Sequence, residues 1–160
     1  MEKIQFDDIA GLQKFISEEY DEFGDEFEIT QEAINKFADV TGDHQWIHLD
    51  VERCKKESPF GTTIAHGFLT LSLLPMLSGL SKTPYAIVGF ANGVNYGSDK
   101  LRFLSPVPAG SKIHSRSRLV SVEAGKKGTR VEQETAIHVV GSDRPALVYN
   151  MITLFQGKVG

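Results

Sequence analysis

Apolar residues recur at helical spacing in the first half of the chain and in strand-like runs in the second half. The stretch from Asp7 to Tyr20 is predicted to be a helix, because its apolar residues lie three or four positions apart. A short strand is expected around Phe27, where apolar residues alternate with glutamates. A second helix is predicted between Thr30, which suits an N-cap, and Gly42, which can end a helix.

The middle of the chain carries a long segment without charge. Residues 58–81 contain no Asp, Glu, Lys or Arg, and the segment is long enough on paper to cross a bilayer. Its many Gly, Ser, Thr and Pro residues make it too polar for lipid, so a helix buried inside a soluble protein is predicted instead. Pro75 predicts a bend or an early end of this helix. A shorter helix capped by Asp50 is expected just before it, over residues 51–56.

After Pro84 the pattern becomes that of consecutive strands. The expected strands are Tyr85–Tyr96, Lys100–Phe103, Lys112–Glu123, Thr129–Val140 and Ala146–Phe155. Helices followed by strands predict an α+β fold with a mainly antiparallel sheet. An apolar central helix against a long curved sheet is the hot-dog arrangement, here with an extra N-terminal helix. Such a sheet has edges that need cover, so a homodimer formed by edge pairing is expected.

Composition fits one globular domain spanning residues 1–160, since 41% of the residues are hydrophobic and 24% are charged. The net charge of −4 predicts no nucleic-acid partner, because such a partner needs a clustered basic surface. The single cysteine, Cys54, cannot form an internal disulfide, and the acidic N-terminus does not read as a secretory signal. A cytoplasmic protein that does not cross a membrane is therefore expected. Arg116 and Arg118, with Glu132 and Glu134 on the next strand, predict cross-strand charge pairs.

The segment between residues 41 and 50 carries the most unusual chemistry. It is expected to be a loop that places Asp43 and His48 five positions apart, close to Trp46, which is a candidate substrate-binding residue. A carboxylate and an imidazole suit a reaction that takes a proton from water and delivers one to carbon. His44 lies four residues from His48, but metal-binding histidines at that spacing normally share a helix face. No metal or redox cofactor is therefore expected.

A second motif, residues 60–68, stands where the uncharged helix begins. Backbone N–H groups at a helix start have no partner within the helix and lie at the positive end of its dipole. Gly67 is the candidate donor to the oxygen of a thioester carbonyl, because a glycine lets a ligand approach the backbone. His66 either is structural or lines the site entrance. Asn95 either hydrogen-bonds in the pocket or satisfies local backbone.

The run from Phe37 to Asp50, followed by Pro59–Gly61 and Ile64–Phe68, resembles the MaoC-like dehydratases, which include the (R)-specific enoyl-CoA hydratases. The resemblance covers roughly residues 30–107. It implies a hot-dog homodimer that reversibly hydrates a trans-2-enoyl thioester of coenzyme A, or of a carrier protein, to the (R)-3-hydroxyacyl product.

The family's catalytic Asp and His match Asp43 and His48, and its oxyanion glycine matches Gly67. Two departures are visible. Gln45-Trp46 stands where the commoner hydratases have Asn-Pro, as in the nodulation-protein-N-like branch, and Pro75 stands where some members carry a serine.

Two other functions fit a hot-dog fold. A thioesterase commonly uses a carboxylate on or just before the central helix, and residues 58–81 have none. A non-catalytic subunit that binds acyl thioesters would not need the pair Asp43 and His48.

Overall fold

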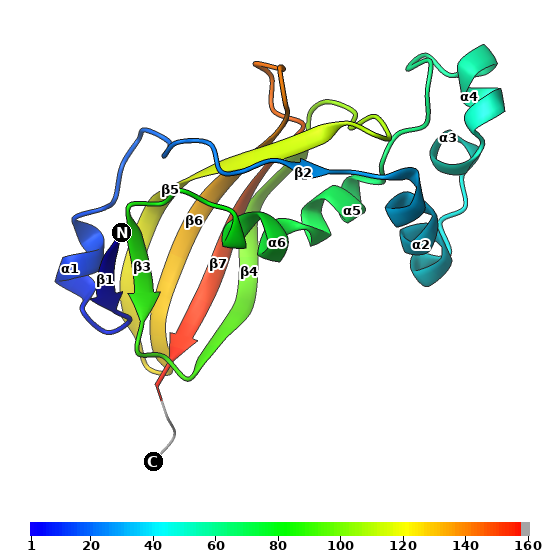
Figure 1. The fold of residues 1–160 in the computed structure, drawn as a ribbon. Coiled ribbons are helices and arrows are strands. Elements are labelled where there is room, and N and C mark those ends of the chain that lie inside the picture. Colours follow the sequence, from blue (N-terminus) through cyan, green and yellow to red (C-terminus); the bar gives the residue numbers. More distant parts are fainter. Residues whose placement is uncertain (158–160) are drawn as a thin grey trace.

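The structure, a computed structural model, describes residues 1–157, and its largest element is a curled antiparallel sheet of five strands (Figure 1). The strands lie in the order β2 (Phe27–Glu28), β5 (Lys112–Gly125), β6 (Gly128–Val139), β7 (Leu147–Gln156) and β4 (Asn92–Phe103). Turns after Gly125 and Gly141 join β5, β6 and β7 in sequence. The α+β hot-dog architecture is confirmed. The last three residues of the expected domain, 158–160, lie outside the described residues.

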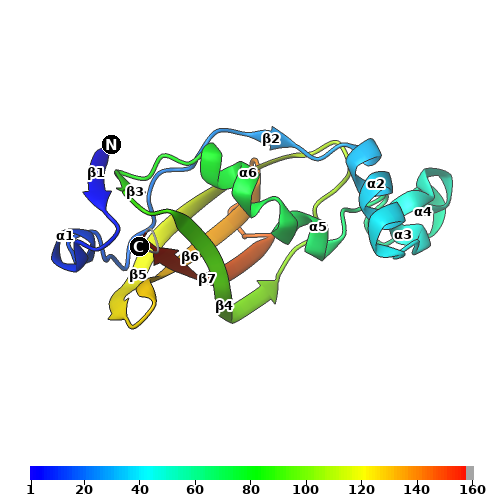
Figure 2. The same cartoon turned by 90° about the horizontal axis from the view of Figure 1, so that it is seen from below.

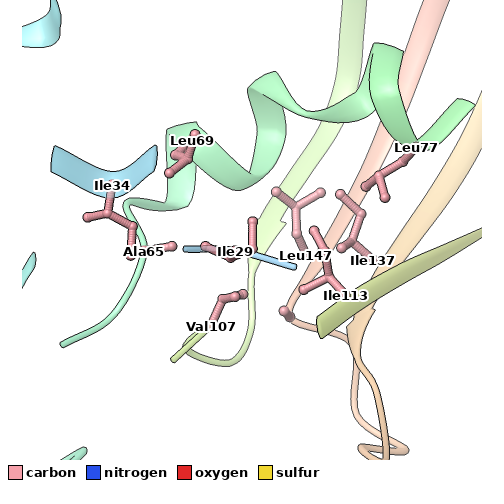
Figure 3. Close-up of a cluster of buried hydrophobic side chains, with 10 residues drawn as sticks. Ile29, Ile34, Ala65, Leu69, Leu77, Val107, Ile113, Ile137 and Leu147 are labelled. Carbon is pink, nitrogen blue, oxygen red and sulfur yellow. The ribbon is translucent and has the colours of Figure 1, made fainter. Parts of the chain in front are cut away.

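The uncharged segment forms two short helices, α5 (Gly67–Ser72) and α6 (Leu74–Gly79), around which the sheet curls (Figure 2). The predicted break is confirmed: Pro75 lies in the first turn of α6, where its missing N–H is not needed. Leu69 and Leu77 bury their side chains in the main core. Figure 3 shows them near core residues of the strands and the connecting loops, with Ile113, Ile137 and Leu147 among those labelled.

The expectation that the fold wraps this helix on all sides is wrong for one copy of the chain. Phe68 is 63% exposed and Met76 is 49% exposed, although both lie on the helices that the sheet surrounds. The sheet covers only one side of α5 and α6, so two large apolar side chains face outward.

Three helices gather at one end of the molecule: α2 (Gln31–Thr41), α3 (Trp46–Leu49) and α4 (Val51–Glu57) (Figure 1). Thr30 caps α2 by accepting from the Ala33 N–H, and Gly42 ends it with φ of 77°, as predicted. Asp50 caps α4 as predicted. The expected loop is wrong in one detail, because residues 46–49 form the single turn α3, stabilised by the adjoining helices.

The N-terminal region departs most from the predicted pattern. Helix α1 (Ile9–Gln13) is shorter than expected, and after it the chain runs along the open edge of β5. There the N–H groups of residues 17, 21 and 24 donate to β5 carbonyls, at 3.2, 2.8 and 2.8 Å. An open strand edge offers these hydrogen bonds, and local helical spacing cannot reveal that competition. A further strand that the pattern missed, β1 (Glu2–Gln5), pairs in parallel with β3 (Tyr85–Val88).

The strand predicted over residues 85–96 is two strands. Gly89, with φ of 81°, turns the chain between β3 and β4. Strand β4 then continues through the predicted gap at residues 97–99, where two irregularities shift its pairing with β7. Every helix among residues 1–157 is too short or too polar to span a lipid bilayer.

The predicted charge pairs on β5 and β6 are half confirmed. Arg118 donates to Glu134 at 2.8 Å. Arg116 instead faces Ala136 across the strands, and Glu132 accepts from the Asn150 side chain. The strand register decides this outcome: it places Arg118 opposite Glu134 and Arg116 opposite Ala136, so Glu132 falls beyond both arginines and faces Ser121.

Candidate active site

Asp43 follows the left-handed residue that ends α2, which turns the chain sharply away from the helix. Its Oδ1 accepts from the Gln45 side-chain amide at 3.2 Å and from the Gln45 backbone N–H at 3.4 Å. Partial desolvation raises the pKa of Asp43, but these hydrogen bonds and the nearby His66 and His48 outweigh it and hold the pKa below its usual value. Gln45 is a site residue that the sequence singled out only as a departure from the commoner family pattern.

His48 is buried, and α3 fixes its position between two backbone segments. Its Nδ1 lies 2.7 Å from the Ile64 carbonyl oxygen, which can only accept, so Nδ1 carries the proton. The Gln31 side chain, at the start of α2, donates to the His48 carbonyl at 2.7 Å. These bonds leave His48 Nε2, in the neutral ring, as a free proton acceptor.

His66 links the two motifs that the sequence singled out. Its Nε2 donates to the backbone carbonyl of Asp43 at 2.9 Å, and its ring stacks on that of His48 with 3.8 Å between centroids. His66 is 4% exposed, and its buried Nδ1 has no hydrogen-bond partner among residues 1–157. The structure thus places His66 behind Asp43 and His48, and not only at the entrance.

A cavity of about 200 Å³ opens over these groups. Its lining residues are Phe37, Thr41, Asp43, His48, His66, Gly67 and Phe68. One carboxylate oxygen of Asp43 and one ring nitrogen of each histidine lie within 4.8 Å of one another.

These three side chains also form the one potential metal-ligand group found among residues 1–157. Ligands of a tetrahedral zinc ion stand about 2.0–2.2 Å from it, which needs separations of roughly 3.5 Å. Here His66 Nε2 and Asp43 Oδ2 are 4.0 Å apart, and that nitrogen already donates to a carbonyl. The two rings are also nearly parallel, at 26°, so their nitrogens do not converge on one point. The geometry fits a water molecule better than a metal ion.

Gly67 is the first residue of α5 and lines two cavities, the one above and a neighbouring one of about 300 Å³. A Cβ at this position would lie 2.7 Å from the ring of Phe103, so any larger residue would require that ring to move. Its N–H has no acceptor within α5 and is available to a ligand. Because α5 has only six residues, the direct hydrogen bond matters more here than the helix dipole that the sequence indicated.

The other two predicted site residues lie outside the cavity over Asp43. Trp46 packs under the Arg53 guanidinium, 4.2 Å from the ring centroid, and lines none of that cavity. Asn95 lies exposed on the edge strand β4. Burial raises the pKa of the Cys54 thiol, which disfavours the reactive thiolate form.

Comparison with known proteins agrees with this architecture. Residues 14–141 match the model of the MaoC like domain. The chain is 45% identical over 151 residues to the 3-hydroxyacyl-thioester dehydratase Z of Mycobacterium tuberculosis (strain ATCC 25618 / H37Rv), covering 94% of this chain and 97% of that protein. It is 44% identical over 133 residues to the nodulation protein N of Rhizobium leguminosarum bv. viciae, covering 80% and 79%.

Solved structures give the same fold. The R-hydratase PhaJ1 from Pseudomonas aeruginosa superposes with a TM-score of 0.66 at 22% identity, covering 88% of this chain and 83% of that one. The monoamine oxidase regulatory protein from Archaeoglobus superposes with a TM-score of 0.68 at 26% identity, covering 86% and 88%. The chain belongs to the MaoC-like family, whose hot-dog members include dehydratases and hydratases.

Proposed function

We propose that this protein is a hydro-lyase that reversibly adds water to a trans-2-enoyl thioester, of coenzyme A or of a carrier protein, to give the (R)-3-hydroxyacyl thioester. One observation carries the proposal: an ionisable carboxylate and a histidine with a fixed tautomer meet at one cavity. The names of the similar dehydratase and hydratase support the same reaction class.

The geometry of Asp43 and His48 suits one bound water molecule. Two hydrogen bonds of about 2.8 Å that meet at a tetrahedral oxygen join atoms roughly 4.6 Å apart. One carboxylate oxygen of Asp43 and one ring nitrogen of His48 lie within 4.8 Å of each other, a separation close to that of this bridge. Asp43, whose pKa is lowered, would be ionised at neutral pH and would orient the water.

The proton would pass through His48. Its unprotonated Nε2 takes a proton from the water while the water oxygen bonds to C3 of the substrate. The π electrons of the C2=C3 bond move toward the carbonyl and form an enolate. The imidazolium then returns the proton to C2, so one water has been added and His48 is regenerated. Delivery from the same side chain places both new bonds on one face.

The enolate oxygen needs a hydrogen-bond donor, and the Gly67 N–H is our candidate. It lies at the junction of the two cavities, so a carbonyl held there would leave C2 and C3 in the cavity over Asp43. A preorganised donor at a developing oxyanion commonly contributes about 10²–10³ in kcat.

The test is hydration of crotonyl-CoA and of a longer enoyl-CoA, followed as loss of the conjugated enoyl absorbance. Asp43→Asn should lower kcat about 10²–10⁴-fold, since it removes a positioned ionised group. Asp39→Asn is the matched control, because Asp39 lies four residues away, its side chain is largely exposed, and within the described part of the chain that side chain bonds only to His44. Its activity should match the parent's.

Three results would contradict the proposal. A folded Asp43→Asn variant with the parent's rate would remove Asp43 from the mechanism. Release of free coenzyme A from acyl-CoA would identify a thioesterase. Saturable binding of enoyl-CoA without turnover would identify a non-catalytic binder.

We also propose that two copies pair through β4. This strand ends the sheet, so one edge has no partner strand, and 11 of its 12 residues are exposed. An edge strand that exposes its side chains on both faces and its backbone N–H and C=O groups along one edge can pair with a strand of another chain. Val94, Tyr96 and Phe103 on β4 and Phe68 on α5 supply apolar surface. Asn95 would then lie at the interface between the copies.

Light scattering with size-exclusion chromatography tests the pairing. The parent should elute with twice the mass of the chain, and Val94→Lys should shift it toward one chain mass, because a charge would be buried at the interface. The matched control is Val140→Lys, an exposed valine beyond the end of β6. A parent of single-chain mass would overturn the pairing.

A further inference from the structure

A second polar pocket, of about 270 Å³, lies away from Asp43. Its lining residues are Phe23, His114, Arg116, His138, Gly141, Ser142 and Asp143. His114 and Arg116 alternate on β5 with the buried Ile113 and Ser115, so they lie on the opposite face of the sheet from α5 and α6. His138 pairs with His114 across the strands and shares that face. No part of the proposed reaction uses this pocket.

His138 has an unsatisfied nitrogen in this pocket. The side chain is 1% exposed, and its Nδ1 donates to the Ser142 carbonyl at 3.1 Å. The neutral ring therefore presents a bare Nε2, which is buried and has no partner among residues 1–157. The Nε of Arg116 is likewise buried and unpartnered. Buried polar atoms are nearly always hydrogen-bonded, so two unpaired atoms on residues that line one pocket require an explanation.

The pocket also contains a positive charge, the guanidinium of Arg116. Arg116 forms no ion pair among residues 1–157 and packs instead over Tyr20 and Phe23, at 4.9 and 4.8 Å. Two residues further along the strand, Arg118 pairs with Glu18 and Glu134, each at 2.8 Å. The difference isolates Arg116 as a cation with no anionic partner.

Two carboxylates lie near this cluster, and neither neutralises it. Glu26 is held by Lys112 at 2.9 Å, and Asp143, on the β6–β7 turn, has no cation within 4 Å among residues 1–157. Burial lowers the pKa of His138, and the charge of Arg116 lowers it further. The hydrogen bond to the Ser142 carbonyl and the charge of Asp143 act in the opposite direction but do not outweigh them. Burial also lowers the pKa of His114, with help from His138. An anion in the pocket would reverse these charge effects.

We propose that the pocket formed by His114, Arg116 and His138 binds a phosphate group. A phosphate oxygen can accept from Arg116, and a phosphate that keeps one proton can donate it to the bare His138 Nε2. A carboxylate at neutral pH has no proton to donate and leaves that nitrogen unsatisfied. Because the second pKa of a phosphate monoester is about 6, the protonated form is well populated in mildly acidic solution. Affinity should therefore fall as pH rises above this range.

The experiment titrates inorganic phosphate into the full chain at pH 6 and constant ionic strength, with imidazole signals followed by NMR. Phosphate should shift the His114 and His138 signals and raise the pKa of both residues. Arg116→Gln should weaken binding about tenfold or more, because a charge-assisted hydrogen bond is lost. Arg144→Gln is the matched control. It makes the same charge change on the β6–β7 turn beside the pocket, at an exposed residue that does not line the pocket.

Sulfate supplies a sharper comparison, because it has no proton to donate at pH 6 and should bind more weakly than phosphate. Shifts that are absent, that are equal with sulfate, or that persist in a folded Arg116→Gln variant would overturn the proposal. Coenzyme A distinguishes the source of the group. Displacement of phosphate by coenzyme A identifies a phosphate of that cofactor, and failure to displace it identifies free phosphate. Activity on crotonyl-CoA is a separate readout, so the failure of either proposal leaves the other standing.

Discussion

Two histidine pairs in this protein share a construction. In the cavity over Asp43 the rings of His48 and His66 stack with centroids 3.8 Å apart, and on the outer face those of His114 and His138 lie 6.3 Å apart. Each pair has a ring nitrogen that donates to a backbone carbonyl, and each leaves one buried nitrogen without a partner. In each pair the hydrogen bond to the carbonyl fixes the orientation of a ring, and one ring nitrogen has no hydrogen-bond partner among residues 1–157.

The pairs differ in the charged side chain with which each one shares its pocket. The first pair adjoins the carboxylate of Asp43, which can hold a water and stabilise a protonated imidazole. The second adjoins the guanidinium of Arg116, which opposes protonation and attracts an anion. The residue type is therefore the same at both places, and the sign of the neighbouring charge decides between proton transfer and anion binding.

The largest difference between the pairs should appear in catalysis. His48→Gln should lower kcat about 10²–10⁴-fold, because it removes the group proposed to move the proton. His138→Gln, which makes the same change in the second pair, should leave the rate of crotonyl-CoA hydration at the parent's level. If kcat fell equally in both variants while both remained folded, the two histidine pairs would not differ in their role in catalysis.

The second-largest difference should be in the stability of variants at the two arginines on β5, Arg116 and Arg118. Arg118→Gln leaves the buried carboxylate of Glu134 without its cation and should lower the free energy of unfolding by about 2–3 kcal/mol, less than for a fully buried pair. Arg116→Gln breaks no ion pair among residues 1–157 and removes only the packing of the guanidinium over Tyr20 and Phe23, so it should lower the free energy of unfolding less, by about 1 kcal/mol. Urea denaturation measures both. A larger loss for Arg116→Gln would mean that an unseen interaction stabilises it.

His66→Asn tests the role of the stacked ring in the first pair. The change removes both the stacking on His48 and the reach of Nε2 to the Asp43 carbonyl. Loss of one buried hydrogen bond of about 1–2 kcal/mol should lower kcat roughly 5- to 30-fold, with KM little changed. His66→Gln, which can still donate a hydrogen bond, should recover part of the rate. A fall in thermal stability with an unchanged kcat would make His66 purely structural.

The smallest expected effect is the pH dependence of stability. Because the pKa of His138 is lowered in the folded protein, the unfolded chain binds protons more readily over the range from that lowered value up to about 6.5. Stability should therefore rise with pH across this range and level off above it. His138→Asn should flatten the rise, and phosphate should reduce it in the parent. Urea denaturation at several pH values measures this, and an unchanged slope in the variant would contradict it.

Much of the site could be read from residue order, because its members lie close together in the chain. Asp43 and His48 are five positions apart, and their motif identifies the family without any long-range contact. Gln45 was visible as an unusual residue, but its donation to Asp43 was not, because no residue pattern fixes which way an exposed amide turns. The role of His66 behind the pair depends on contacts across 18 to 23 positions.

The sequence by itself determined the change from helices to consecutive strands after Pro84, the caps of α2 and α4 and the break at Pro75, since each depends on a few neighbouring residues. Only the tertiary structure decided the pairing of β1 with β3, the course of residues 16–24 along β5 and the separate environments of the two arginines. These features arise from hydrogen bonds and ion pairs between residues that are far apart in the chain. Local periodicity is the same whichever distant partner a segment finds.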